Sequence, residues 1–229
     1  MDGLGEEGEI TMKHDFQYIS KNDPAVKEAY ANLVNMQYEL QNVLRGTFTF
    51  QFTPVGSYKR NMITRDVKSN VGFDFDFNIE VNDNGLTAAQ TKMKLQEAMN
   101  RVVTKYGYDY PENSTRVLTI KKKDRKNSRI IHSCDFAIVN NYVDDDGNEC
   151  QDYIRFNKKN NTYSWCEQPD GYYMLPDKIE WVKQNGLWTD VRDLYLDLKN
   201  KNDNPDVHSR TIFAITVHQI CQKNGFFDE

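Results

Sequence analysis

Two aspartates separated by one residue, Asp74 and Asp76, are the part of the sequence best suited to chemistry. They lie in FDFDFNIEV, where apolar and polar residues alternate as they do in a half-buried β-strand. This alternation places both carboxylates on one face of the strand, with their Cα atoms ~7 Å apart. Adjacent carboxylates repel each other, and two divalent cations ~3.5–4 Å apart would relieve that repulsion. For this pattern alone, the alternative is an ordinary solvated strand face.

A glycine and a serine precede the two aspartates, at Gly56 and Ser57, directly after the alternating stretch TFTFQFTPV. Glycine lets backbone N–H groups approach a phosphate closely, and a serine at a helix start adds a hydroxyl donor. An ordinary turn is the alternative for Gly56 and Ser57 taken alone. A strand, a Gly-Ser turn and a second strand that carries both aspartates form a much narrower pattern.

A third carboxylate, Asp135, lies in the apolar stretch IIHSCDFAIV. An unpaired buried carboxylate is costly, so this residue needs a partner. We predict that the partner is a metal ion shared with Asp74 and Asp76. The alternative is an ion pair in the core with a lysine or arginine of the next strand.

The remaining elements alternate between helical and extended patterns. Asp23 and Pro24 predict the start of a helix that runs to about residue 44, and a second amphipathic helix is expected over residues 86–107. The charged segment KKKDRKNSR (121–129) is expected to be a turn between two strands. Its part KKKDRK (121–126) is expected to be a charged hairpin tip, with a nucleic-acid-binding patch as the less favoured alternative. Strands are expected within 115–120, 130–139, 151–156 and 161–167, and helices near 176–185, 189–200 and 208–224.

In order and spacing, GSYKRNMI, FDFDFNIEV and CDFAIV resemble the polymerase-β nucleotidyltransferase superfamily. Within that superfamily the likeness is greatest to the cGAS/DncV-like (CD-NTase) and oligoadenylate-synthase-like groups. PDKIEWV, VRDLYLDLKNKND and VHSRTIFAITVHQI resemble the helical part of those groups. The resemblance covers residues from about 20 to 224.

This resemblance implies an α+β nucleotidyltransferase fold, in which helices flank a mixed β-sheet. We expect a flexible N-terminal lead-in (1–20), a catalytic core (21–170) and a short helical C-terminal part packed on the core (171–229).

The resemblance also implies a metal-dependent enzyme that joins nucleotides from NTPs or dNTPs and releases pyrophosphate. Asp74, Asp76 and Asp135 would be catalytic and would bind two Mg²⁺ ions, for which Mn²⁺ could substitute. Gly56, Ser57, Lys199 and Ser209 would bind the nucleotide. For Lys199 a solvated helix end is an equal alternative. For Ser209 the alternative is a helix N-cap, and both roles can hold together.

The expected product is a signalling oligonucleotide or cyclic nucleotide in antiviral (anti-phage) defence. The expected partners are nucleoside triphosphates, a nucleotide or oligonucleotide acceptor, and an effector protein that responds to the product. The alternatives are a template-independent polymerase of short single-stranded DNA or RNA, nucleotidylation of a tRNA or protein, and a degenerate partner-binding module without activity.

Composition limits the cellular setting and the partners. The four cysteines are scattered without a C-x-x-C pair, which favours a reduced, cytoplasmic protein. No apolar run approaches the ~18 residues that a membrane span needs. The formal net charge of −5 indicates that any nucleotide is held by a local basic pocket or by metal ions.

Overall fold

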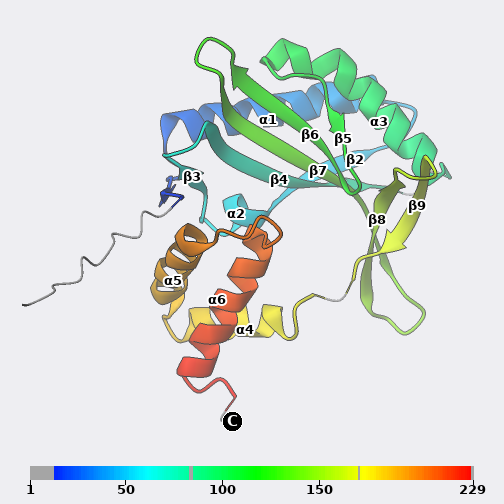
Figure 1. Cartoon of the computed structure of the whole chain (residues 1–229). Helices are drawn as coiled ribbons and strands as arrows, with labels where there is room; N and C mark the ends of the chain where they lie inside the picture. The colour runs from blue at the N-terminus through cyan, green and yellow to red at the C-terminus, as the bar shows by residue number, and fades with distance from the viewer. Residues whose placement is uncertain (1–12, 83–84, 170, 228–229) are drawn as a thin grey trace, which may run out of the picture. The chain divides into compact units, whose positions relative to one another are not determined.

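The computed structural model describes residues 13–82, 85–169 and 171–227. The chain divides into two compact units (Figure 1). The sheet unit contains Tyr18–Arg65 and Asn70–Gly171. The helical unit contains Asp66–Ser69, Tyr172–Glu229 and the N-terminal residues up to Gln17. The combination of a mixed sheet with helices confirms the predicted α+β class.

The central sheet of the sheet unit has the strand order β2-β4-β7-β6-β5, and β8 and β9 extend it from β7. Strands β4 and β7 are parallel, and the other neighbouring pairs are antiparallel. The strands are β2 (Phe50–Val55), β4 (Val71–Val81), β5 (Glu112–Asn113), β6 (Val117–Asp124), β7 (Arg129–Val143), β8 (Glu149–Asn157) and β9 (Thr162–Glu167).

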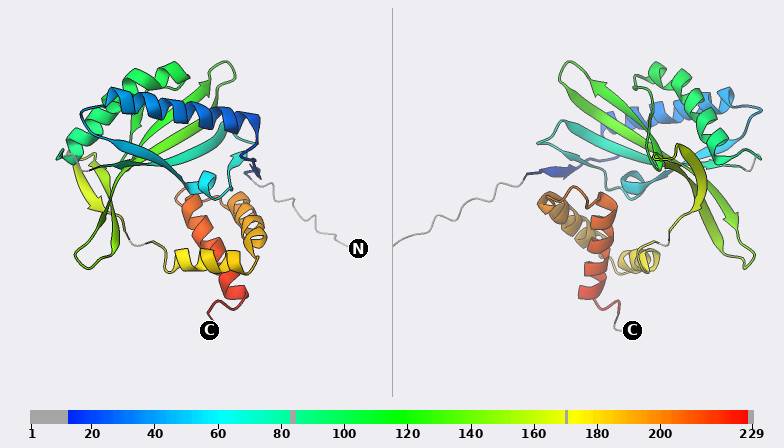
Figure 2. Two further views of the ribbon diagram at one scale, coloured as in Figure 1. Left: turned by 180° about the vertical axis from the view of Figure 1, so that it is seen from behind. Right: turned by 45° about the vertical axis from the view of Figure 1, so that its right-hand side comes forward.

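Strand β4 shows why the sheet has one apolar and one polar face. Phe73, Phe75, Phe77 and Ile79 are buried, as alternation requires for side chains directed into the core. The helices α1 (Pro24–Val43) and α3 (Ala88–Val102) cover this apolar face, as the views of Figures 1 and 2 agree. The residues between the buried ones therefore lie on the opposite face.

Local signals determine where these two helices begin and end. The Asp23 side chain accepts a hydrogen bond from the Ala25 N–H at the start of α1, as predicted. Thr87 and Gln90 form a reciprocal capping box at the start of α3. Beyond α3 the chain forms a 3₁₀ turn, η1 (Val103–Tyr106). Gly107, with a positive φ of 80°, ends this turn.

The hairpin between β6 and β7 is longer than predicted, because backbone pairing continues through the lysines to Asp124 and Arg129. Several of its charges form ion pairs, as expected of a charged hairpin. Ion pairs join Lys121 to Glu112 at 2.7 Å, Lys123 to Asp109 at 2.7 Å, Arg125 to Asp109 at 2.8 Å and Arg129 to Asp124 at 3.2 Å.

The helical unit contains α4 (Leu175–Gln184), α5 (Trp188–Lys201) and α6 (Ser209–Lys223). Their bounds agree with the three predicted C-terminal helices to within about two residues. Among the residues that the structure describes, no helix is long and apolar enough to cross a membrane.

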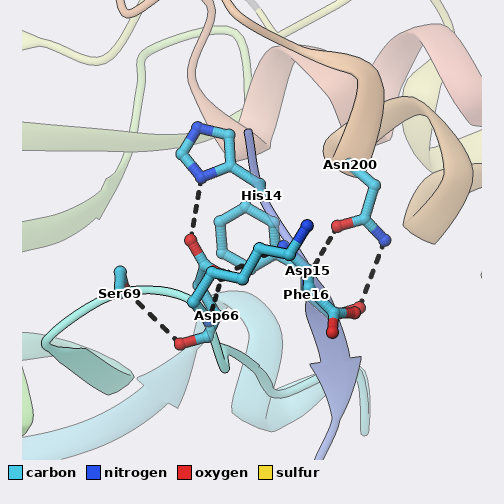
Figure 3. A network of polar contacts seen from close by, with 7 residues as sticks. His14, Asp15, Phe16, Asp66, Ser69 and Asn200 are labelled. Carbon is cyan, nitrogen blue, oxygen red and sulfur yellow. Dashed lines mark hydrogen bonds and ion pairs between the residues drawn. The ribbon is translucent and has the colours of Figure 1, made fainter. Parts of the chain in front are cut away.

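The predicted lead-in of residues 1–20 is ordered where the structure describes it, and its residues 1–12 lie outside the described part. Strand β1 (Phe16–Tyr18) pairs with β3 (Thr64–Asp66). Figure 3 shows the polar contacts that hold β1. The Asp66 carboxylate contacts His14 Nδ1 at 2.8 Å and accepts from the Asp15 N–H at 3.0 Å, and Asn200 Nδ2 donates to the Phe16 carbonyl at 3.2 Å.

Candidate functional site

The register of β4 and β7 brings together the three aspartates that the sequence singled out. Asp76 is directly paired with Asp135, and Asp74 is paired with Ser133. Side chains paired across neighbouring strands lie on the same face of the sheet, so all three carboxylates emerge from the polar face. Asp74 is exposed, whereas Asp76 and Asp135 are half-buried.

The Gly-Ser turn packs directly against Asp76. Gly56 and Ser57 begin the short helix α2 (Gly56–Lys59), and Gly56 has a positive φ of 59°. A Cβ atom at Gly56 would lie 2.1 Å from Asp76 Oδ2, so no other residue fits without displacing that carboxylate. The backbone N–H of Ser57 hydrogen-bonds the Asp76 carboxylate. The turn therefore positions a carboxylate, in addition to the phosphate-binding role expected from the sequence.

The electrostatics of the three carboxylates show that they interact. Burial, together with the negative charges of Asp135 and Asp74, raises the pKa of Asp76 to about 6. Burial also raises the pKa of Asp135, which the hydrogen bond from Thr119 partly opposes. A divalent cation would reverse both effects, because it stabilises the ionised forms.

Two hydroxyl groups hold the outer carboxylates. Ser133 Oγ donates to Asp74, and Thr119 Oγ1 donates to Asp135. Within the described residues, no three acidic, histidine or cysteine side chains are gathered into a metal-ligand arrangement. The donor set nevertheless fits Mg²⁺ or Mn²⁺, since all its ligands are carboxylate oxygens and the carboxylates that share one face repel one another.

The other two predicted nucleotide-binding residues, Lys199 and Ser209, lie in the helical unit. Lys199 Nζ lies 4.2 Å from the ring centre of Phe16 and 5.7 Å from that of Tyr195, an arrangement typical of cation–π contacts. Ser209 is the first residue of α6, and His208 is the N-cap position. The alternative in which Ser209 caps this helix is therefore wrong.

Sequence reasoning missed three residues beside the carboxylates: Ser133, Thr119 and Arg60. Ser133 lies two residues before Asp135, so strand alternation alone could have placed it on the polar face. Thr119 becomes recognisable only from the pairing of β6 with β7, which places it opposite Asp135. The positive charge of Arg60 lowers the pKa of Asp76, against the larger effects that raise it.

Asp135 accepts a hydrogen bond from a threonine hydroxyl on the next strand. The sequence had offered an ion pair with a lysine or arginine of that strand as the alternative to a metal ion. Lys121 on β6 is near enough for its charge to lower the pKa of Asp135, but its Nζ lies 2.7 Å from Glu112 Oε2.

Comparison with known proteins gives a structural likeness without a sequence match. No known family model matches the chain, and no curated protein matches it. Similar solved structures include the CdnE cyclic dinucleotide synthase of Elizabethkingia meningoseptica with GTP, with a TM-score of 0.52 at 15% identity. The match covers 87% of this chain and 70% of that one.

Two further solved structures are similar to the same extent. The CD-NTase CdnG of Bradyrhizobium diazoefficiens in complex with GTP has a TM-score of 0.56 at 11% identity, over 88% of this chain and 67% of that one. The Vibrio cholerae DncV cyclic AMP-GMP synthase in complex with nonhydrolysable GTP has a TM-score of 0.53 at 14% identity. That match covers 85% of this chain but only 51% of DncV.

These likenesses confirm the fold predicted from the motifs. The chain has the nucleotidyltransferase fold of the cGAS/DncV-like proteins, at a sequence identity too low to carry their substrates or products.

Proposed function

We propose that the chain is a metal-dependent nucleotidyltransferase of the CD-NTase-like group, which joins nucleotides and releases pyrophosphate. One observation carries the proposal: the parallel register that pairs Asp76 with Asp135, on the same face as Asp74 and against the Gly56 turn. On an ordinary solvated strand face, two aspartates would have no reason to lie beside a third carboxylate on the neighbouring strand. The fold shared with cyclic dinucleotide synthases supports the same reaction class.

In the proposed reaction, an acceptor hydroxyl oxygen attacks the α-phosphorus of a nucleoside triphosphate. The new phosphodiester bond forms as the bond to the β-phosphate oxygen breaks, pyrophosphate leaves, and the hydroxyl proton is released to solvent. Asp74, Asp76 and Asp135 would hold two Mg²⁺ or Mn²⁺ ions. When bound, such ions neutralise phosphate charge and lower the pKa of the acceptor hydroxyl.

The residues of this chain provide position and orientation. Gly56 leaves room for the Asp76 carboxylate, and the Ser57 N–H fixes one side of it. Ser133 and Thr119 orient Asp74 and Asp135 through their hydroxyl groups. The Ser57 hydroxyl can donate to a phosphate oxygen, and Lys199 and Ser209 are proposed to contact the triphosphate. Such positioning accounts for most of the rate in phosphoryl transfer.

We further propose that the product is a cyclic dinucleotide or short signalling oligonucleotide, made in the cytoplasm for antiviral defence and read by an effector protein. The names of the similar structures, which are cyclic dinucleotide synthases, support this over the modification of a tRNA or a protein. The complete set of carboxylates argues against a degenerate binding module.

The decisive experiment incubates the purified chain with mixed NTPs and dNTPs and either Mg²⁺ or Mn²⁺, and identifies the products by mass spectrometry. Pyrophosphate release and products heavier than the input nucleotides support the proposal. Both signals should disappear with EDTA. A signal that survives EDTA, or transfer of the label only onto added tRNA or protein, contradicts it.

A further inference from the structure

A hollow lies at the end of β4 on the sheet unit. It has a volume of about 290 Å³ and is lined by Phe50, Gln51, Glu80, Val81, Asn82 and Asn141. Three of these six residues carry an amide, one carries a carboxylate and two are apolar. The six include no lysine or arginine, so the hollow does not suit a phosphate group.

The polar residues of this hollow share the sheet face with the catalytic carboxylates. Glu80 follows Asp76 by four residues on β4, and Gln51 is paired directly with Glu80. Asn141 follows Asp135 by six residues on β7. Even spacings along a strand keep side chains on one face, so the carboxylates and the amides face the same way.

Their separation suits the two ends of one nucleotide. Four residues of β-strand place the Cα atoms of Asp76 and Glu80 ~13 Å apart. A nucleotide that extends along β4 from a phosphate at Asp76 would place its base beside Gln51 and Glu80.

The hydrogen bonds within the hollow leave one acceptor and one donor available to a ligand. Gln51 Nε2 donates to Glu80, and Asn141 Oδ1 accepts from Gln151 Nε2 at 2.7 Å. Over the described residues, these bonds leave the carbonyl oxygen of Gln51 and the amino group of Asn141 open. Amide groups that offer both a donor and an acceptor are the ones that recognise the edge of a nucleobase, and a carboxylate can accept from an exocyclic amino group.

We propose that this hollow is a nucleobase-recognition subsite, in which Gln51, Glu80 and Asn141 select the base of a substrate nucleotide. This inference rests on the proposed nucleotidyl transfer, and it assigns the choice of base to a part of the sheet away from the carboxylates. Phe50 and Val81, which also line the hollow, direct their side chains into the buried core on the other face of the sheet, so recognition falls to the polar side chains.

The test compares the intact wild-type chain with Gln51→Ala, Asn141→Ala and the double variant. The measurement is kcat/KM for pyrophosphate release with each of ATP, GTP, CTP and UTP supplied alone. We expect the ratio between the best and the second-best nucleotide to fall about tenfold in the double variant. Asn140→Ala is the matched control, because Asn140 is the neighbouring residue on the opposite face of β7, and its ratio should equal that of the wild type.

A second measurement separates this inference from the proposed function. Dissociation constants for nonhydrolysable analogues of the four nucleotides, obtained by calorimetry on the same variants, do not require turnover. A wild type that selects among the analogues and a double variant that does not support the subsite, even if no pyrophosphate is released. Unchanged ratios in the double variant, or no preference among bases in the wild type, overturn it. Loss of turnover in Asp76→Asn together with unchanged base ratios in the double variant would overturn only the subsite.

Discussion

At the scale of single residues, Asp76 combines the most constraints. Its carboxylate lies against Gly56, accepts from the Ser57 N–H and shares the polar face with two further aspartates. Its raised pKa of about 6 means that ionisation of this group destabilises the folded chain near neutral pH. Such a charge is retained where a cation or a reaction requires it.

Asp76→Asn should therefore abolish turnover and leave the fold intact. Loss of a charged metal ligand should lower kcat by more than ~10³-fold at saturating Mg²⁺. The metal-free variant should melt at the same temperature as the wild type or higher near pH 7. This difference should shrink as the pH falls toward 4, because the wild-type carboxyl then becomes neutral. Asp145→Asn, at an exposed hairpin position, is the control, and near-normal kcat in Asp76→Asn would remove this residue from the site.

Gly56→Ala tests the contact between the turn and the carboxylate. Gly46→Ala is the matched control, since Gly46 also has a positive φ but a Cβ there would meet nothing within 4 Å. Strain at positive φ should lower the free energy of unfolding by ~1–2 kcal/mol in both variants. Gly56→Ala should lose more stability than Gly46→Ala, because its Cβ displaces the Asp76 carboxylate. For the same reason it should also lose activity. Urea unfolding and pyrophosphate release measure the two effects, and an equal loss of stability with full activity in both variants would contradict the prediction.

At the scale of elements, β7 is the strand that organises the sheet unit. It pairs in parallel with β4, antiparallel with β6 and, beyond these, with β8. Its polar face carries Asp135, and its apolar face carries His132, which is buried. His132 Nε2 lies 2.9 Å from the Tyr108 hydroxyl, and the ring of His132 stacks on Phe73.

The buried His132 predicts how stability depends on pH. Burial, together with a smaller effect of the positive charge of Lys122, lowers the pKa of His132 to about 4. The unfolded chain takes up a proton near pH 6.5 and the folded chain does not, so this contribution is fully present above pH 6.5 and is lost as the pH falls toward 4. At ~1.4 kcal/mol per pH unit, the full loss is ~3 kcal/mol.

The double variant Tyr108→Phe/His132→Phe should remove that dependence. The difference between its unfolding free energy and that of the wild type should shift in favour of the variant by up to ~3 kcal/mol between pH 6.5 and 4. The single variant His132→Phe leaves the Tyr108 hydroxyl without this partner and should lose ~1–3 kcal/mol at pH 8. Urea titrations at a series of pH values measure both effects. A constant difference across the whole range would show that His132 does not carry the dependence.

At the scale of the whole molecule, two compact units are present, and the candidate carboxylates all belong to the sheet unit. The chain has a net charge of −5 and spans between about half and 70% of the structures it resembles. Binding of a long nucleic-acid template draws on many cationic contacts, which this composition does not favour.

We therefore expect synthesis without a template. The purified chain, supplied with nucleoside triphosphates and Mg²⁺ or Mn²⁺ alone, should release pyrophosphate and form species heavier than the input nucleotides. Chromatography and mass spectrometry identify these species, and Asp74→Asn should eliminate them. Transfer of label from an α-³²P nucleotide onto a tRNA or protein, with no free oligomer, would show that the acceptor is a macromolecule.

The sequence by itself determined the local features of this protein. Alternation fixed the face of β4 that carries Asp74 and Asp76, and Asp23 with Pro24 fixed the start of α1, because both depend on neighbouring residues. The order of the motifs was sufficient to predict the fold. Only the tertiary structure decided which strand lies beside β4 and in what register. The pairing of Asp76 with Asp135 follows from that register. Strand pairing joins segments far apart in the chain, and a shift of one residue would have directed Asp135 into the core.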